Sequence, residues 1–210
     1  MFLKLGSVFS AVLLFSASGV GECRAATTYS ASNAFESGWK HHHNPNGVWS
    51  YGYSAGFTGP VTLYGQTLQN GVNGPNAQYW LDPATNLGNS PSAEYNDGPA
   101  YDNGNVHFAE RQFLLVSGIG GEFSDLVFTA PANGQYSIAG VFRGCQYGIG
   151  VAVGIVINGT TAFSSSVHAV NQKVSFKKSV ALNAGQTVVF SVGPAGGLQN
   201  TGLSATITKQ

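Results

Sequence analysis

The sequence contains few charged residues, and this scarcity excludes several classes of partner. Charged side chains make up 9% of the 210 residues and the formal net charge is zero, whereas ordinary soluble domains carry roughly 25%. The longest basic run after the N-terminal segment is Lys177-Lys178. A surface with so weak an electric field favours neutral ligands. It argues against nucleic acid and against anionic membrane surfaces.

The N-terminal segment has the layout of a secretory signal. Lys4 precedes an apolar run from Val8 to Phe15, and small residues follow as far as Ala25. Such a run is too short to cross a bilayer, so it indicates a removed leader and no membrane span. We therefore expect a signal peptide at residues 1–25 and one secreted domain, extracellular or periplasmic, at residues 26–210.

Cysteine is nearly absent, which excludes a fold held by disulfides. The chain has only Cys23 and Cys145, and removal of the leader takes Cys23 away. A domain of this size can bury an adequate core without disulfides. We expect Cys145 to be a small and poorly reactive side chain, with intermolecular pairing as the alternative.

Helical periodicity is also lacking after the leader, while short β-type runs recur at 8 to 12 residue spacing. In the run Gln135–Phe142, for example, Tyr136, Ile138 and Phe142 share one face of a strand. The pattern predicts an all-β fold, a single jelly-roll-like antiparallel β-sandwich with long loops rich in Gly, Asn and Pro. The main expected strands are Thr27–Phe35, Val48–Tyr53, Val106–Phe108, Phe113–Ser117, Asp125–Thr129, Gln135–Phe142, Ile149–Ile157, Thr161–Phe163, Val167–Phe176, Lys178–Leu182, Thr187–Val192 and Leu203–Thr208.

Several short motifs resemble those of a known group of proteins. The stretch Asn44–Gly52, with Phe128–Pro131, Gly134–Tyr136 and the ending Thr201–Ile207, looks like exported bacterial β-sandwich proteins, some of which carry a C-terminal sorting tail. That group is similar to galactose-binding-like and carbohydrate-binding modules. The resemblance covers most of residues 26–210 and implies the fold more than an activity.

Two aromatic or histidine-rich stretches are open to two interpretations. Trp49, Tyr51 and Tyr53 share one strand face, which is either core or a stacking surface, and the core is favoured because aromatics dominate sandwich interiors. The run His41-His42-His43 invites a metal site. Adjacent side chains diverge on a strand, however, so an exposed loop is expected instead.

Catalytic patterns are present without the context that catalysis needs. Gly52-Tyr53-Ser54-Ala55-Gly56 matches a nucleophile elbow, and Asp125 and His168 follow in the order of a hydrolase triad. An elbow serine must open a helix, which Phe57-Thr58-Gly59-Pro60 cannot do. The carboxylates have no recognisable glycosidase signature either. We therefore expect no enzyme activity.

The loops contain the residue types that recognise sugars. An aromatic ring packs on the C–H face of a pyranose, while amides or a guanidinium bind its hydroxyls. The candidate ligand-binding residues are Trp80, Tyr79, Tyr95, Tyr101, Arg143, Tyr147 and Asn200. Scattered structural aromatics are the alternative interpretation, because exposed apolar groups are common on any protein.

Two turn-like segments could supply oxygen ligands to calcium. They contain Asp97, Asp102 and Asn105, whose hard oxygens suit Ca²⁺. Neither segment matches an EF-hand loop, and ordinary Asx turns are the favoured alternative.

Together these features predict a secreted, non-catalytic binding module for neutral glycans or a cell-surface polymer. The alternative is a structural or adhesive extracellular protein that oligomerises or binds a protein partner through exposed strand edges.

Overall fold

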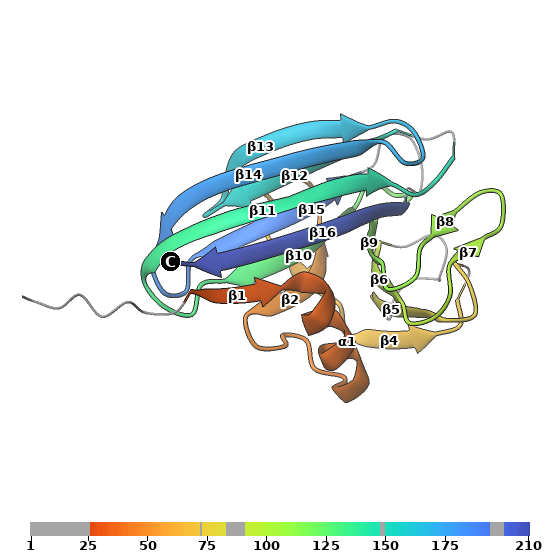
Figure 1. Cartoon of the computed structure of the whole chain (residues 1–210), viewed down its shortest axis with the longest axis horizontal. Coiled ribbons are helices and arrows are strands. Elements are labelled where there is room, and N and C mark those ends of the chain that lie inside the picture. Colours follow the sequence, from red (N-terminus) through yellow and green to blue (C-terminus); the bar gives the residue numbers. More distant parts are fainter. Residues whose placement is uncertain (1–25, 72, 83–90, 148–149, 194–199) are drawn as a thin grey trace, which may run out of the picture.

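The computed structural model describes residues 26–71, 73–82, 91–147, 150–193 and 200–210 (Figure 1). Its elements are β1 Thr27–Ser30, α1 Ala31–His41, β2 Trp49–Ser54, β3 Thr62–Leu63, β4 Gln66–Gln69, β5 Ala77–Leu81, β6 Ser92–Asn96, β7 Tyr101–Asp102, β8 His107–Phe108, β9 Phe113–Val116, β10 Phe123–Thr129, β11 Gly134–Gly144, β12 Val151–Ile157, β13 Thr160–Val167, β14 Lys173–Leu182, β15 Thr187–Gly193 and β16 Asn200–Lys209. Residues 1–25, the predicted signal peptide, lie outside the described residues.

Two antiparallel sheets pack face to face. One has the order β14-β11-β16-β9-β6-β5-β4, with β1 beside β16, and the other has the order β13-β12-β15-β10-β2-β3. The predicted all-β, jelly-roll-like sandwich is therefore confirmed. Within the described ranges, no helix has the length and hydropathy needed to cross a membrane.

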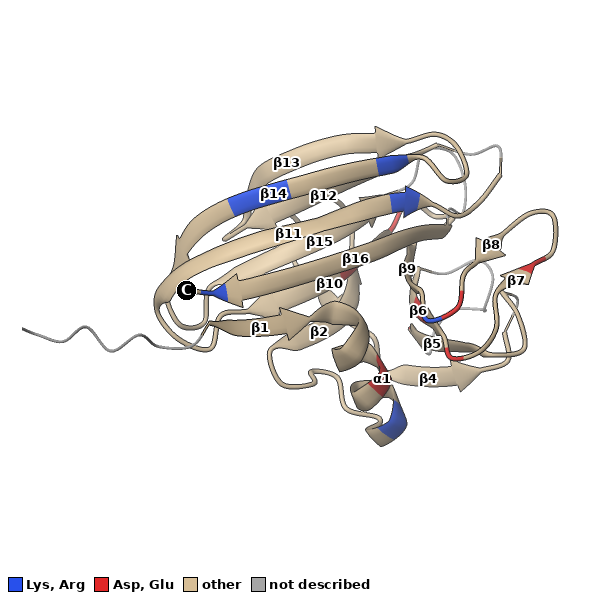
Figure 2. Ribbon diagram, in the orientation of Figure 1, with Lys and Arg blue, Asp and Glu red and all other residues tan. Residues whose placement is uncertain are grey.

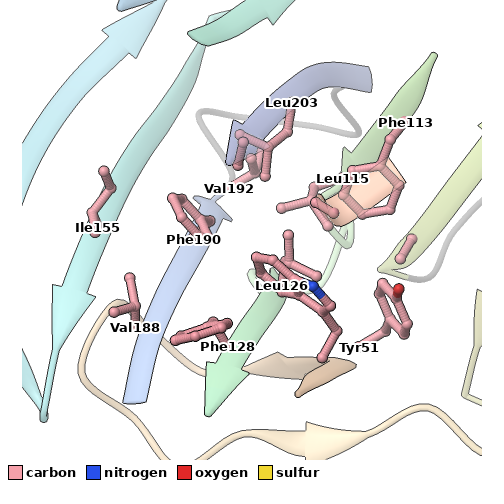
Figure 3. Close-up of a cluster of buried hydrophobic side chains, with 14 of the residues drawn as sticks. Tyr51, Phe113, Leu115, Leu126, Phe128, Ile155, Val188, Phe190, Val192 and Leu203 are labelled. Atoms are coloured by element: carbon pink, nitrogen blue, oxygen red, sulfur yellow. The ribbon is translucent and has the colours of Figure 1, made fainter. Parts of the chain in front are cut away.

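The core between the sheets combines large aromatic rings with aliphatic side chains (Figure 3). Trp49 packs edge-on against Phe128 at 5.2 Å between ring centroids, and Tyr51 packs against Phe35 at the same distance. The core interpretation of the Trp49, Tyr51 and Tyr53 face is confirmed for the first two, which are buried, whereas Tyr53 is half-buried. The period of two is also confirmed in β11, where Tyr136, Ile138 and Phe142 are buried. These faces hold the sheets together.

The predicted strand Thr27–Phe35 is wrong beyond Ser30, because the chain turns into helix α1. Ala31, Phe35 and Gly38 are buried on one face of this helix, a spacing of four and three residues that suits an amphipathic helix. The helix ends where His42 takes a left-handed conformation and its amide donates to the carbonyl of Trp39. The histidine run is exposed, as expected, but His41 belongs to a helix end and not to a loop.

Two of the crossings between the sheets lie side by side and are hydrogen-bonded to each other. The chain leaves β10 for β11 through Ala130–Asn133, and leaves β14 for β15 through Asn183–Gln186. The Ala130 amide donates to the Gln186 carbonyl, and the Gly185 amide donates to the Ala130 carbonyl, each at 2.8 Å. One end of the sandwich is fixed by this pair of crossings.

The Asn158-Gly159 hairpin follows the sequence signal, whereas the strand bounds after β13 do not, since β14 runs unbroken from Lys173 to Leu182. Asn158 and Gly159 both have positive φ, 49° and 77°, as a tight hairpin between β12 and β13 requires. The predicted strand Val167–Phe176 is wrong in its middle. A turn at residues 168–172, with Asn171 at φ 65°, separates β13 from β14.

A second, smaller hydrophobic cluster lies on the other face of β5, β6 and β9. It contains Tyr79, Phe108, Leu114 and the predicted free cysteine, Cys145. Cys145 is 1% exposed and burial raises the pKa of its thiol to about 11, which agrees with the expected unreactive side chain. This part of the eight-stranded sheet is therefore covered on both faces.

Candidate functional site

The site begins with the strand register of the six-stranded sheet. Ser50 of β2 pairs with Val127 of β10, which pairs with Val189 of β15, which pairs with Val156 of β12. Side chains opposite one another in a sheet share a face, and neighbouring residues such as Leu126 and Phe190 point into the core. The row from Ser50 to Val156 therefore lies on the outer face, and it forms the floor of a groove.

A covering segment, residues 55–63, lies across the outer face beside this row. Glycines allow the close approach. A Cβ on Gly154 would lie 2.6 Å from Cε1 of Phe57, and a Cβ on Gly52 would clash with the Thr62 carbonyl. The ring of Phe57 packs edge-on against Phe123 at 4.9 Å between centroids. The covering segment thus forms one wall of the groove.

The groove has a volume of about 340 Å³. Its lining combines apolar and hydroxyl groups without a charged side chain: Ser50, Phe57, Thr58, Gly59, Val61, Leu63, Val127, Val156, Gly159, Thr187 and Val189. Natural ligand sites commonly pair such an apolar surface with a few polar groups that set orientation. The groove can therefore pack against C–H groups and exchange hydrogen bonds with hydroxyls, and it offers no ion pair.

Polar groups are buried under the covering segment, next to the groove. Asp125 of β10 is paired in register with Gly52 of β2 on one side and with Ser191 of β15 on the other. The Ser191 hydroxyl donates a hydrogen bond to Oδ1 of Asp125. Burial raises the pKa of Asp125 to about 6, and the hydroxyls of Ser191 and Ser54 oppose that rise. Asp125 is fully buried, so it supports the sheet and does not line the groove.

Ser54 is not placed as a nucleophile. It ends β2 with its hydroxyl donating to the carbonyl of Gly56 at 3.0 Å, and turns and bends follow it without a helix. His168 contacts Ser166, with 2.8 Å between Nε2 and the hydroxyl, on the strand at the opposite edge of the sheet. The expectation that Gly52–Gly56 is no elbow agrees with this geometry.

Three of the predicted sugar-stacking residues are core side chains. Tyr79 is 0% exposed, Trp80 3% and Tyr95 2%. Trp80 stacks on Tyr51 at an interplanar angle of 6°, and Tyr95 packs on Phe35 at 5.8 Å. Their strands are covered on both faces, so neither side of the sheet presents these rings to a ligand in this structure.

The remaining predicted ligand residues lie near the same end of β11 and β16 but do not form one surface. Tyr147 is 48% exposed, whereas Tyr101 is half-buried against Gly74. Asn200 is 5% exposed, and its amide donates to Oε1 of Gln146 at 2.8 Å. Arg143 points to the outer face of the eight-stranded sheet.

The predicted calcium ligands form Asx turns. Oδ1 of Asp102 accepts from the Gly104 amide at 2.8 Å, while the Asn105 amide donates to Oδ1 of Asn103 at 2.9 Å. Oδ2 of Asp97 accepts from Gln78 at 3.2 Å, in a different hydrogen-bonded group. Among the described residues no three His, Cys, Asp or Glu side chains come together as a metal site.

The groove residues were not predicted, although the sequence of β10 contains a pattern that indicates a covered outer face. The run Leu126-Val127-Phe128 is apolar at consecutive positions, which indicates a strand covered on both faces and not a half-buried one. Once β10 is seen as such a strand, Val127 must have a partner on the outer face. The register that adds Val156 and Val189 could not be read from the chain alone.

Comparisons with known proteins give distant structural similarities only. No protein-family model matches the chain, and no curated protein has a similar sequence. A family 35 carbohydrate binding module from Clostridium thermocellum is 15% identical, with a TM-score of 0.31 over 62% of this chain and 87% of that one. A TmCBM61 structure in complex with β-1,4-galactotriose is 12% identical, with a TM-score of 0.34 over 88% and 99%. The CBM36-1 domain of a xylanase from a Trinervitermes trinervoides hindgut metagenome is 15% identical, with a TM-score of 0.34 over 53% and 90%.

Replacing Asp125 by Asn should remove a pH-dependent loss of stability. The folded protein keeps a proton on Asp125 up to about pH 6, whereas the unfolded chain releases it near pH 3.8. Between these values the folded state binds more protons, so its free energy of unfolding falls as pH rises. From pH 4 to pH 7 the Asp125→Asn variant should gain on the order of 3 kcal/mol relative to the wild type.

Urea unfolding at a series of pH values measures this difference, and the exposed Asp97→Asn variant is the control. Apart from Asp125 and Asp97, the titrating groups are the same in the wild type and in both variants, so their contributions cancel in the difference. A difference between wild type and Asp125→Asn that stays constant from pH 4 to pH 7 would show that Asp125 is not held protonated.

Proposed function

We propose that this protein is an exported, non-catalytic module that binds a neutral glycan in the groove on the outer face of the six-stranded sheet. The observation that carries the proposal is the lining of that groove, which combines apolar side chains with hydroxyl groups and has no charged side chain. A neutral saccharide is the ligand class that needs this combination.

The groove matches the two surfaces of a pyranose ring. The C–H face of the sugar would pack on Val127 and Val189, with the ring of Phe57 at its side, and would remove apolar area from water. Ser50 of β2 and Thr187 of β15 lie on strands on either side of β10, and each can donate or accept a hydrogen bond. The volume of about 340 Å³ falls within the usual range of ligand pockets.

The glycan should bind through the covering segment. We expect retention of the protein on an immobilised neutral glycan from a broad panel, and at least tenfold weaker retention of the Phe57→Ala and Thr58→Lys variants. The first variant removes the ring beside the floor, and the second places a long charged side chain at the rim. Affinity electrophoresis in gels that contain each glycan measures the effect.

Matched controls separate the groove from general damage. Thr62→Lys introduces the same charge at an exposed threonine of β3 that does not line the groove, so it should leave retention unchanged. Tyr147→Ala tests the alternative that the glycan binds at the loops near the end of β11 and β16, where Tyr147 is exposed. Loss of retention in Tyr147→Ala but not in Phe57→Ala would overturn the groove assignment, and retention that EDTA abolishes would revive the calcium prediction.

A second candidate function, self-association as a structural or adhesive protein, is favoured by one edge strand. β13 is the terminal strand of the six-stranded sheet and has the sequence TTAFSSSV, without charge or proline. The long edge strand β14 carries three lysines instead, which discourage pairing. Sedimentation velocity over a range of concentrations should show dimers if β13 pairs between copies, and a monomer at all concentrations would exclude this function.

A further inference from the structure

The charged residues are segregated over the surface, although the net charge is zero. Strands β11, β14 and β16 contain no Asp or Glu. Figure 2 shows blue segments on these adjacent strands and no red ones. Their cationic residues are Arg143, Lys173, Lys177, Lys178 and Lys209. One part of the eight-stranded sheet is therefore locally basic.

Two of these cations face each other across the strands. Arg143 of β11 is paired in register with Lys173 of β14, and on its other side with Gly202 of β16. Like charges directly opposite in a sheet destabilise it. Neither Arg143 nor Lys173 has an ion pair to a described acidic residue. The sheet therefore holds a repulsive pair that an anion would relieve.

The guanidinium of Arg143 is held in place by the turn after β13. Its Nε and Nη2 both donate to Oδ1 of Asn171, the former at 3.1 Å. Asn171 adopts a positive φ of 65° in that turn. A guanidinium fixed in this way loses less rotamer entropy when it binds an oxyanion.

Both cations line a groove of about 260 Å³, which is distinct from the uncharged groove. Its lining is Ser32, Arg111, Gln112, Phe113, Val141, Arg143, Lys173, Gly202, Leu203 and Ser204. Arg111 is 3.5 Å from Oε2 of Glu36 and so is partly neutralised. No acidic side chain lines the groove, and its hydroxyl and amide groups can add hydrogen bonds to those of the cations.

The geometry points to a binding site for an anionic group in this second groove, and we propose that its ligand is an acidic polysaccharide that bears carboxylate or sulfate groups. Arginine and lysine make charge-assisted hydrogen bonds to such oxyanions. A single-stranded nucleic acid would stack its bases on exposed rings, and the one ring in the lining, Phe113, is 1% exposed. This site goes beyond the proposed neutral-glycan function and stands without it.

Affinity electrophoresis at low salt tests the proposal with three polymers in the gel: sodium polygalacturonate, dextran sulfate and neutral dextran. The wild type should be retarded by one or both acidic polymers and not by dextran. The polymer that retards it identifies carboxylate or sulfate as the ligand. Retardation should weaken as salt is added, because the interaction is between exposed charges.

The double variant Arg143→Gln/Lys173→Gln should lose at least about tenfold in affinity for the acidic polymer. Lys177→Gln/Lys178→Gln is the matched control, because it removes the same charge from β14 outside the groove. It should lose less than about threefold if the groove and not general attraction binds the polymer. If the double variant fails to fold, the single variant Lys173→Gln, at an exposed position of edge strand β14, replaces it in the same measurement.

Three results would overturn the site: no retardation by either acidic polymer, equal losses in the two double variants, or tighter binding to duplex DNA than to both polymers. Phe57→Ala should leave this retardation unchanged. Failure of the neutral-glycan proposal and failure of the anionic site are therefore distinguishable.

Discussion

The layer of aromatic rings between the two sheets is the constraint on which the rest of the structure depends. Trp49, Tyr51, Phe128 and Phe190 all belong to it, and rings of this size supply much of the buried area of a sandwich. With few charged residues and no described disulfide, the fold relies on this packing. Phe35 extends the layer from α1, which therefore closes the sandwich and does not stand apart from it.

The same layer decides where a ligand can bind. Because Trp80 and Tyr95 are used in packing, the binding sites that we propose lie on the outer faces of the sheets. On the six-stranded sheet, glycines at positions 52 and 154 let the covering segment approach the strands and shape an uncharged groove. On the eight-stranded sheet, Gly202 lies in register beside Arg143, and its missing side chain makes room for the amide of Gln112. A neutral and a cationic surface can thus coexist in a chain of zero net charge.

The strands were largely predictable, because a half-buried strand such as β11 must alternate apolar and polar residues. Helix α1 was missed since its buried face consists only of Ala31, Phe35 and Gly38, and glycine is a poor helix former. Burial of Trp80 could not be foreseen, because it depends on packing against Tyr51, which belongs to the other sheet. The Arg143–Lys173 pair required the register of strands 30 residues apart, and no local pattern gives that register.

Amide hydrogen exchange with and without a saturating neutral glycan tests the central claim, that the outer groove of the six-stranded sheet binds this ligand. We predict slower exchange at residues 57–63, since the ligand covers that segment, and unchanged exchange at residues 101–107 and 147. Protection confined to residues 101–107 and 147, with none at residues 57–63, would contradict the account and move the site to the loop end of the sandwich.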